Sequence, residues 1–139
     1  MNQVPLEVKD YMTAVVITVS PQDEITQAMK LMIERDVSGL VVVEDGDRVV
    51  GVITERDGIA VATSAGYFEE WGGPVHRYMS APVECVAPSE NLVDVADRMI
   101  KSRHRRFPVV DQGRLVGVLT RRDVLRALED GSWFKPSTP

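Results

Sequence analysis

An internal repeat constrains the fold of this chain more than any other feature. The segment Gly51–Asp57, GVITERD, recurs as Gly117–Asp123, GVLTRRD. Val8–Ala14 likewise returns as Val75–Ala81, at an offset of 67 residues that falls to 66 after one deletion near Gly46. A unit of about 60 residues buries too little surface to be comfortable alone. We therefore expect the two copies to pack through their sheets into one core, related by a pseudo-twofold axis.

Within each copy, the hydrophobic pattern alternates between strand and helix. Residues 15–19 form a short β-branched run that predicts a strand, and Ser20-Pro21 followed by acids predicts a helix start. The expected core face of that helix has the i, i+3, i+4 spacing. It comprises Ile25, Ala28, Met29, Met32 and Ile33, and in the second copy Leu92, Val95, Ala96, Met99 and Ile100.

Two apolar runs follow in each copy, and a short turn separates them. Residues 40–43 and 49–53, and their counterparts 107–110 and 115–119, predict antiparallel strand pairs buried on both faces. Helices are expected at 55–65 and 121–129. The predicted fold is therefore α/β (α+β), with two β-α-β-β-α repeats.

The expected domain boundaries follow the repeat. Residues 5–66 form the first repeat, 67–74 a linker, 75–130 the second repeat and 131–139 a loosely ordered tail. The glycines and proline of the linker mark a connection, and its aromatic residues Tyr67, Phe68 and Trp71 suggest that it packs on something. Trp133 in the tail is a candidate dimer contact. Ile59, Val61 and Leu125 on the closing helices would be buried in a homodimer.

Charge and targeting signals restrict the function classes. The net charge is −5 and the pI about 5.0, which argues against a general binder of nucleic acid or anionic membranes. Residues 67–139 nevertheless hold 11 of the 16 basic side chains. No signal peptide or membrane span is visible, and the single cysteine excludes an internal disulfide. A cytoplasmic protein is expected.

The basic run and the reactive side chains suggest no second function. Residues 101–106, KSRHRR, could contact nucleic acid, but cations at a helix C-terminus also complement the dipole. Cys85, His76 and His104 form no recognisable catalytic or metal-ligand pattern, so neither catalysis nor a metal site is expected.

The repeated Thr-x-x-Asp pattern has two interpretations. Thr54 and Asp57, and likewise Thr120 and Asp123, could be capping boxes in which each side chain bonds the other residue's backbone. Alternatively, the helix N-terminus could bind an anion while the aspartate takes the two hydroxyls of a ribose. Arg56 and Arg122 between them suit phosphate oxygens, or else are solvated first-turn side chains.

These features together resemble a tandem pair of cystathionine β-synthase (CBS) domains, also called a Bateman module. The resemblance rests on the Tyr-Met-Thr and Tyr-Met-Ser openings, the strands at 37–43 and 105–111, and the two closing segments that contain Thr-x-x-Asp. It covers about residues 5–130. The duplicated set, in order, is far more specific than any one motif.

The resemblance implies a regulatory module that binds AMP, ADP or ATP in two clefts between the repeats. One cleft would use Thr54, Asp57, Val83, Arg105, Arg106, Phe107 and Arg122. The other would use Thr120, Asp123, Val16, Ser38, Gly39, Leu40 and Arg56. Thr13 and Ser80 match the small polar residue common at the family's opening. No resident cofactor is expected, although Mg²⁺ could accompany ATP.

The two clefts are not expected to be equivalent. Arg105-Arg106 are bulkier and more basic than Ser38-Gly39, and Val41 stands where the second copy has Pro108. The Thr54/Asp57 cleft is therefore expected to hold polyphosphates more tightly. Two other function classes compete with a nucleotide sensor: a ligand-free scaffold for protein assembly, and an enzyme on the same fold.

Overall fold

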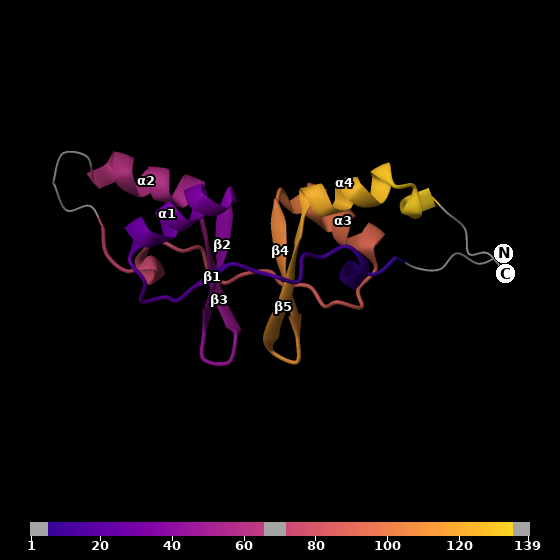
Figure 1. The fold of residues 1–139 in the computed structure, drawn as a ribbon, viewed down its shortest axis with the longest axis horizontal. Coiled ribbons are helices and arrows are strands. Elements are labelled where there is room, and N and C mark those ends of the chain that lie inside the picture. Colours follow the sequence, from indigo (N-terminus) through magenta and orange to yellow (C-terminus); the bar gives the residue numbers. More distant parts are fainter. Residues whose placement is uncertain (1–5, 66–71, 135–139) are drawn as a thin grey trace. The chain divides into compact units, whose positions relative to one another are not determined.

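The structure is a computed structural model that describes residues 6–65 and 72–134. The chain divides into two compact units (Figure 1). The first, here called the 84–139 unit, also contains residues 1–16; the second, the 17–83 unit, is continuous. Residues 8–14 and 75–81 are the opening segments of the two repeats, and each belongs to the compact unit that holds the rest of the other repeat. The compact units therefore divide the chain differently from the sequence repeats.

The 17–83 unit has a three-stranded sheet and two long helices. In chain order it contains β1 (Thr18–Val19), α1 (Ile25–Arg35), β2 (Gly39–Glu44), β3 (Arg48–Thr54), α2 (Glu55–Ala65) and the 3-10 helix η2 (Val75–Arg77). The strand order is β1-β2-β3, with β1 parallel and β3 antiparallel to β2. The predicted strands at 40–43 and 49–53 lie within β2 and β3, and the helix predicted at 55–65 is α2.

The 84–139 unit has the same plan. It contains η1 (Val8–Asp10), α3 (Leu92–Ser102), β4 (Arg106–Asp111), β5 (Arg114–Thr120), α4 (Arg121–Glu129) and η3 (Ser132–Phe134). β4 and β5 are antiparallel, and a single parallel bridge from Val86 to Val109 takes the place of β1. The predicted strands and closing helix of the second copy are therefore confirmed.

Backbone hydrogen bonds attach each opening segment to its unit. Val8 N–H donates to Glu90 O at 2.9 Å, and the equivalent Val75 N–H donates to Asp23 O at 2.8 Å. Farther along, Thr13 pairs with Val118 on β5, as Ser80 pairs with Val52 on β3. The repeated sequence therefore produces the same tertiary pairing twice.

Each unit has its own hydrophobic core. Apolar side chains of the long helices pack on the strands, and the valine of the opening segment completes each core. In the 17–83 unit the fully buried side chains include Ile25, Leu40, Ile53 and Val75. In the 84–139 unit they include Leu92, Phe107, Leu119 and Val8.

Several expectations about local structure were wrong. The strand predicted at 15–19 is reduced to Thr18–Val19, and Val15 is 87% exposed. α1 begins at Ile25 with Glu24 as N-cap, not at Ser20. The reason is that Asp23 closes a separate turn, accepting a hydrogen bond from Ser20 N–H at 2.8 Å, while Gly73 O accepts from Ile25 N–H.

Two residues of the predicted core face lie at the surface. Ile33 is 81% and Ile100 is 71% exposed, whereas Ile25, Ala28 and Met32 of the same stripe are buried. Each isoleucine directly follows a buried methionine of its helix, Met32 or Met99, so it lies at the edge of the buried stripe. Helical spacing therefore overestimated the width of the buried face.

The described part of the 84–139 unit ends in η3. Trp133 lies in η3 and packs, partly buried, against the core of its own unit, and its expected role as a dimer contact stays a prediction. The expected linker aromatics and the last five residues of the tail lie outside the described residues. Within residues 6–65 and 72–134, no helix has the length and apolar character needed to cross a bilayer.

Candidate functional site

Each Thr-x-x-Asp pattern forms a corner where a strand ends and a helix begins. At the Thr120–Asp123 corner, the N–H and Oγ1 of Thr120 donate to Asp123 Oδ2 at 2.8 and 3.0 Å, and Asp123 N–H donates to Thr120 Oγ1. At the Thr54–Asp57 corner the same three bonds recur at 2.9, 2.9 and 3.2 Å. Both patterns therefore form reciprocal capping boxes, which satisfy N–H groups that a helix start leaves unpaired.

The second carboxylate oxygen distinguishes the two corners. Asp123 Oδ1 accepts from Arg126 Nη2 at 2.5 Å and from Thr13 Oγ1 at 3.4 Å. Asp123 is only 4% exposed. Asp57 is more accessible, and no donor within residues 6–65 and 72–134 bonds its Oδ1. A capping box uses one oxygen, so only the Thr54–Asp57 corner leaves a carboxylate oxygen available.

The segment before β2 lies beside the Thr54–Asp57 corner. Ser38 O accepts from Glu55 N–H at 3.0 Å, and Gly39 is the register partner of Thr54. Leu40 is 1% exposed in the core, so it could meet a ligand only through its main chain. The small residues Ser38 and Gly39 therefore border this corner within a single unit.

The matching segment before β4 lies beside the Thr120–Asp123 corner. Arg105 O accepts from Arg121 N–H at 3.1 Å, and Arg106 is the register partner of Thr120. Phe107 is buried like Leu40. Placing Arg105 and Arg106 opposite Thr54 and Asp57, as the resemblance implies, joins residues of two units and stays a prediction.

The remaining candidates differ in exposure. Arg56 and Arg122 are exposed in the first turns of α2 and α4, and the structure gives their guanidinium groups no hydrogen bond or ion pair to any described residue. Val16 and Val83 are half-buried, and each is the last residue before the chain passes from one unit to the other. The arginines are therefore available to an anion, and both the solvated and the phosphate-binding interpretations stay open.

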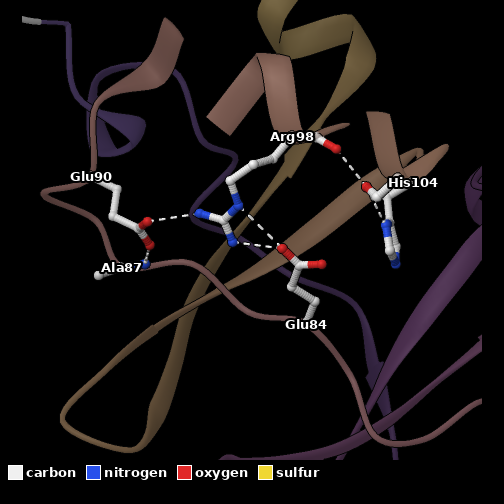
Figure 2. A network of polar contacts seen from close by, with 6 residues as sticks. Glu84, Ala87, Glu90, Arg98 and His104 are labelled. Carbon is white, nitrogen blue, oxygen red and sulfur yellow. Dashed lines mark hydrogen bonds and ion pairs between the residues drawn. The ribbon is translucent and has the colours of Figure 1, made fainter. Parts of the chain in front are cut away.

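A polar network in the 84–139 unit holds the loop before α3 (Figure 2). Arg98 on α3 donates to Glu84 at 2.6 Å and to Glu90 at 2.9 Å, and Glu90 in turn accepts from Ala87 N–H. The hydrogen bond to Glu84 is the main cause that raises the pKa of Arg98. The guanidinium also lies 5.6 Å from the centroid of Phe107, a cation–π distance.

Part of the basic run is used inside the same unit. Lys101 pairs with Asp97 at 2.8 Å, Arg103 caps α3 with a left-handed backbone, and the His104 ring lies 5.2 Å from that of Phe107. His104 Nδ1 also shares a hydrogen bond with Ser102 Oγ, which itself donates to Arg98 O. These contacts support the helix-terminus interpretation of residues 101–106.

The environment of Cys85 disfavours a nucleophilic role. Burial, and to a lesser degree the charge of Glu84, raises the pKa of the Cys85 thiol, which lowers its thiolate fraction at neutral pH. Among the residues that the structure describes, no group of three or more His, Cys, Asp or Glu could hold a metal ion.

The comparison with known protein families identifies both repeats. The family model of the CBS domain matches residues 8–62 and 75–130. The chain belongs to the CBS-domain family. Its two β-α-β-β-α repeats form the tandem pair that the sequence pattern predicted.

Curated relatives have similar sequences over most of the chain. The CBS domain-containing protein YhcV of Bacillus subtilis is 38% identical over 117 residues, which are 84% of this chain and 81% of YhcV. The inosine-5'-monophosphate dehydrogenase of Methanocaldococcus jannaschii is 36% identical over 112 residues, only 21% of that enzyme. The chain spans 42% of another relative from that organism, protein MJ1225. CBS pairs therefore occur in small proteins and as parts of enzymes.

Two similar crystal structures contain adenosyl compounds. CBSX2 in complex with AMP is 33% identical, with a TM-score of 0.82 over 91% of this chain and 98% of that one. A curated CBSX2 protein comes from Arabidopsis thaliana. The CBS domain pair of MJ0100, in complex with 5'-methylthioadenosine and S-adenosyl-L-methionine, is 28% identical with a TM-score of 0.79 over 91% and 98% of the two chains.

Sequence reasoning missed one residue at these corners, Arg126. Its guanidinium reaches both Asp123 and the backbone carbonyl of Tyr11. Arg three positions after Asp on a helix is a spacing that brings the two side chains together. That spacing could have revealed the ion pair. The contact with Tyr11 spans 115 positions and has no local sequence signal.

Proposed function

We propose that this CBS pair is a regulatory module that binds an adenine nucleotide, AMP, ADP or ATP, at its Thr-x-x-Asp corners. The observation that carries the proposal is the adenosyl ligand in two similar CBS pairs, each of which matches 91% of this chain. The available Oδ1 of Asp57 adds support, because a carboxylate oxygen can accept hydrogen bonds from a ribose hydroxyl.

Each group at the corner has a role in this proposal. Asp57 accepts from the ribose hydroxyls, while Ser38 and Gly39 leave room beside Thr54 for the nucleoside. Arg56, in the first turn of α2, supplies a cation for phosphate oxygens, and the helix N-terminus adds its dipole. The residues from the opposite repeat that the resemblance adds, including Arg105 and Arg106, belong to the proposal and favour polyphosphates. Mg²⁺ would enter only with ATP.

A second candidate function is a ligand-free scaffold for protein assembly. Exposed apolar side chains on the helices favour it, because Ile59 and Leu125 are 64% and 61% exposed. We also propose homodimerisation through such surfaces. In the nucleotide-sensor proposal, the regulated protein would be a separate partner that reads the ligand-bound state.

Melting temperatures separate the two candidates. Ligand at about 100 times its Kd stabilises a native state by roughly 2.7 kcal/mol, which should raise Tm by several degrees. We expect AMP, ADP or ATP to do so, with inorganic phosphate as the matched control for anion binding. If saturating AMP, ADP, ATP and S-adenosylmethionine all leave Tm unchanged, the scaffold function is correct instead.

A further inference from the structure

The two corners differ in Arg126, a cation that bonds the aspartate of the Thr120–Asp123 corner and has no counterpart at the same position of α2. Arg126 lies one turn into α4 and bonds Asp123 Oδ1 at 2.5 Å. At the matching position of α2 the chain has Ala60, whose methyl side chain carries no charge. The same backbone geometry therefore presents a neutralised carboxylate at one corner and an accessible one at the other.

Arg126 is held in place from two directions. Its Nη2 also donates to the carbonyl of Tyr11 at 3.1 Å, and the Tyr11 hydroxyl donates to Asp130 Oδ2 at 2.5 Å on the following turn. The opening segment and α4 thus each supply one acceptor to Arg126 Nη2. Because Thr13 from the same segment also donates to Asp123 Oδ1, that oxygen has two protein donors.

A ligand diol at the Thr120–Asp123 corner would have to replace these donors. Charge-assisted hydrogen bonds are the strong ones, and although the Arg126 side chain is 57% exposed, the Asp123 carboxylate that it bonds is buried. At the Thr54–Asp57 corner, a diol at Asp57 Oδ1 replaces no donor from the part of the chain that the structure describes. The cost of replacing Arg126 lowers ligand affinity at one corner and not at the other.

We propose that Arg126 is a latch that closes the Thr120–Asp123 corner to the ribose of a nucleotide, so that the chain binds one nucleotide, at Asp57. This inference rests on the proposed function. It makes Arg126 a positioning residue that acts through Asp123, and the Thr120–Asp123 corner a site that opens when the Arg126 side chain leaves Asp123.

The experiment counts AMP molecules per chain by calorimetric titration. We expect one in the parent protein and none in Asp57→Asn. Arg126→Met, which keeps the aliphatic stem but removes the donors, should bind a second AMP at least tenfold more tightly than the parent does. Asp123→Asn added to Arg126→Met should restore a single site. Arg114→Ala, at the opposite end of β5, is the matched control for charge and should behave as the parent.

Several outcomes overturn the latch. They are two equal AMP sites in the parent, or a single site in both Arg126→Met and Arg126→Ala, with folding verified by circular dichroism. A ligand-free readout is the rotation of the Arg126 guanidinium by NMR, expected to be slower than that of Arg114 and to become fast in Asp123→Asn. Equally fast rotation in the parent contradicts the latch alone, whereas no AMP binding by any variant overturns the proposed function and the latch with it.

Discussion

Asp57 and Asp123 occupy the same position of the repeated motif but have different hydrogen-bond partners. Both aspartates cap a helix through Oδ2, with nearly identical distances. Asp123 in addition bonds Arg126 and Thr13 from a buried position. Its carboxylate therefore contributes to tertiary structure as well as to the helix start, whereas that of Asp57 contributes mainly to the helix start.

We predict that Asp123→Asn destabilises the fold more than Asp57→Asn. The first change neutralises the carboxylate and leaves Arg126 without its charged partner, a loss of about 1–3 kcal/mol. The second keeps an amide oxygen that can still accept the capping hydrogen bond, so it loses mainly the negative charge near the helix N-terminus, about 0.3–1 kcal/mol. Urea unfolding of both variants measures the difference. Equal losses, or a larger loss in Asp57→Asn, would mean that the contacts of Asp123 Oδ1 contribute little.

Cys85 provides a prediction about pH. Because burial raises its pKa, the folded protein has less thiolate at neutral pH than a free cysteine, and the thiolate is the reactive form. Alkylation by iodoacetamide at pH 7.5 should therefore be slower than that of a cysteine-containing peptide, rise with pH above the peptide's midpoint, and reach the peptide rate in urea. Alkylation as fast as the peptide's in the native protein contradicts this environment.

At the scale of elements, the sequence pattern was most informative where packing is local. The runs at 40–43, 49–53, 107–110 and 115–119 are apolar and end at turn residues, and all became strands. The run at 15–19 has the same composition, yet only two of its residues pair, because partners far along the chain decide whether it joins a sheet.

In the candidate site too, local contacts could be recognised from the sequence and long-range contacts could not. The capping box was one of two interpretations that the spacing allowed, and it could be recognised because its contacts span three residues. The hydrogen bond from Thr13 to Asp123 spans 110 positions. It forms because the opening segment of the first repeat belongs to the 84–139 unit. Its two residues were recognised separately, but no local pattern indicates that they meet.

Substituting glycines tests whether the opening segment pairs with β5 as the structure shows. A Cβ at Gly117 would lie 2.9 Å from the backbone carbonyl of Thr13, which cannot move without breaking the bridge to β5. Gly117→Ala should cost about 1–3 kcal/mol. A Cβ at Gly58 in α2 meets only the flexible side chain of Met29.

Gly58→Ala is the matched comparison for that variant. Alanine gains about 1 kcal/mol of helix propensity over glycine, which should offset the displacement of Met29. We expect its unfolding free energy to stay within about 0.5 kcal/mol of the parent, measured by urea unfolding alongside Gly117→Ala. If Gly117→Ala is as stable as Gly58→Ala, the close approach of the opening segment to β5 is wrong.

At the scale of the whole molecule, each unit leaves apolar side chains uncovered on its helices. Ile33 and Ile59 are exposed in the 17–83 unit, and Ile100 and Leu125 in the 84–139 unit. Where such side chains form a contiguous patch, the patch marks an interaction surface. A symmetric dimer would bury the same residues on both copies.

Homodimerisation is therefore the expected state at low micromolar concentration. Sedimentation equilibrium should give about twice the chain mass of 15.4 kDa. Ile59→Lys and Leu125→Lys should shift the protein toward monomer because they place a charge in the interface, while Lys30→Glu on an exposed site serves as a control. A monomer of the unaltered parent protein at low micromolar concentration contradicts the prediction.

The central claim, an adenosyl ligand held through its ribose, is tested most directly by titrating the full chain with AMP and with 2',3'-dideoxy-AMP in one calorimetric experiment. The account predicts saturable binding of AMP, and binding of the dideoxy analogue weaker by at least about tenfold, because the hydrogen bonds from the diol to a carboxylate are lost. Absence of AMP binding, or equal affinity for the two nucleotides, would contradict it.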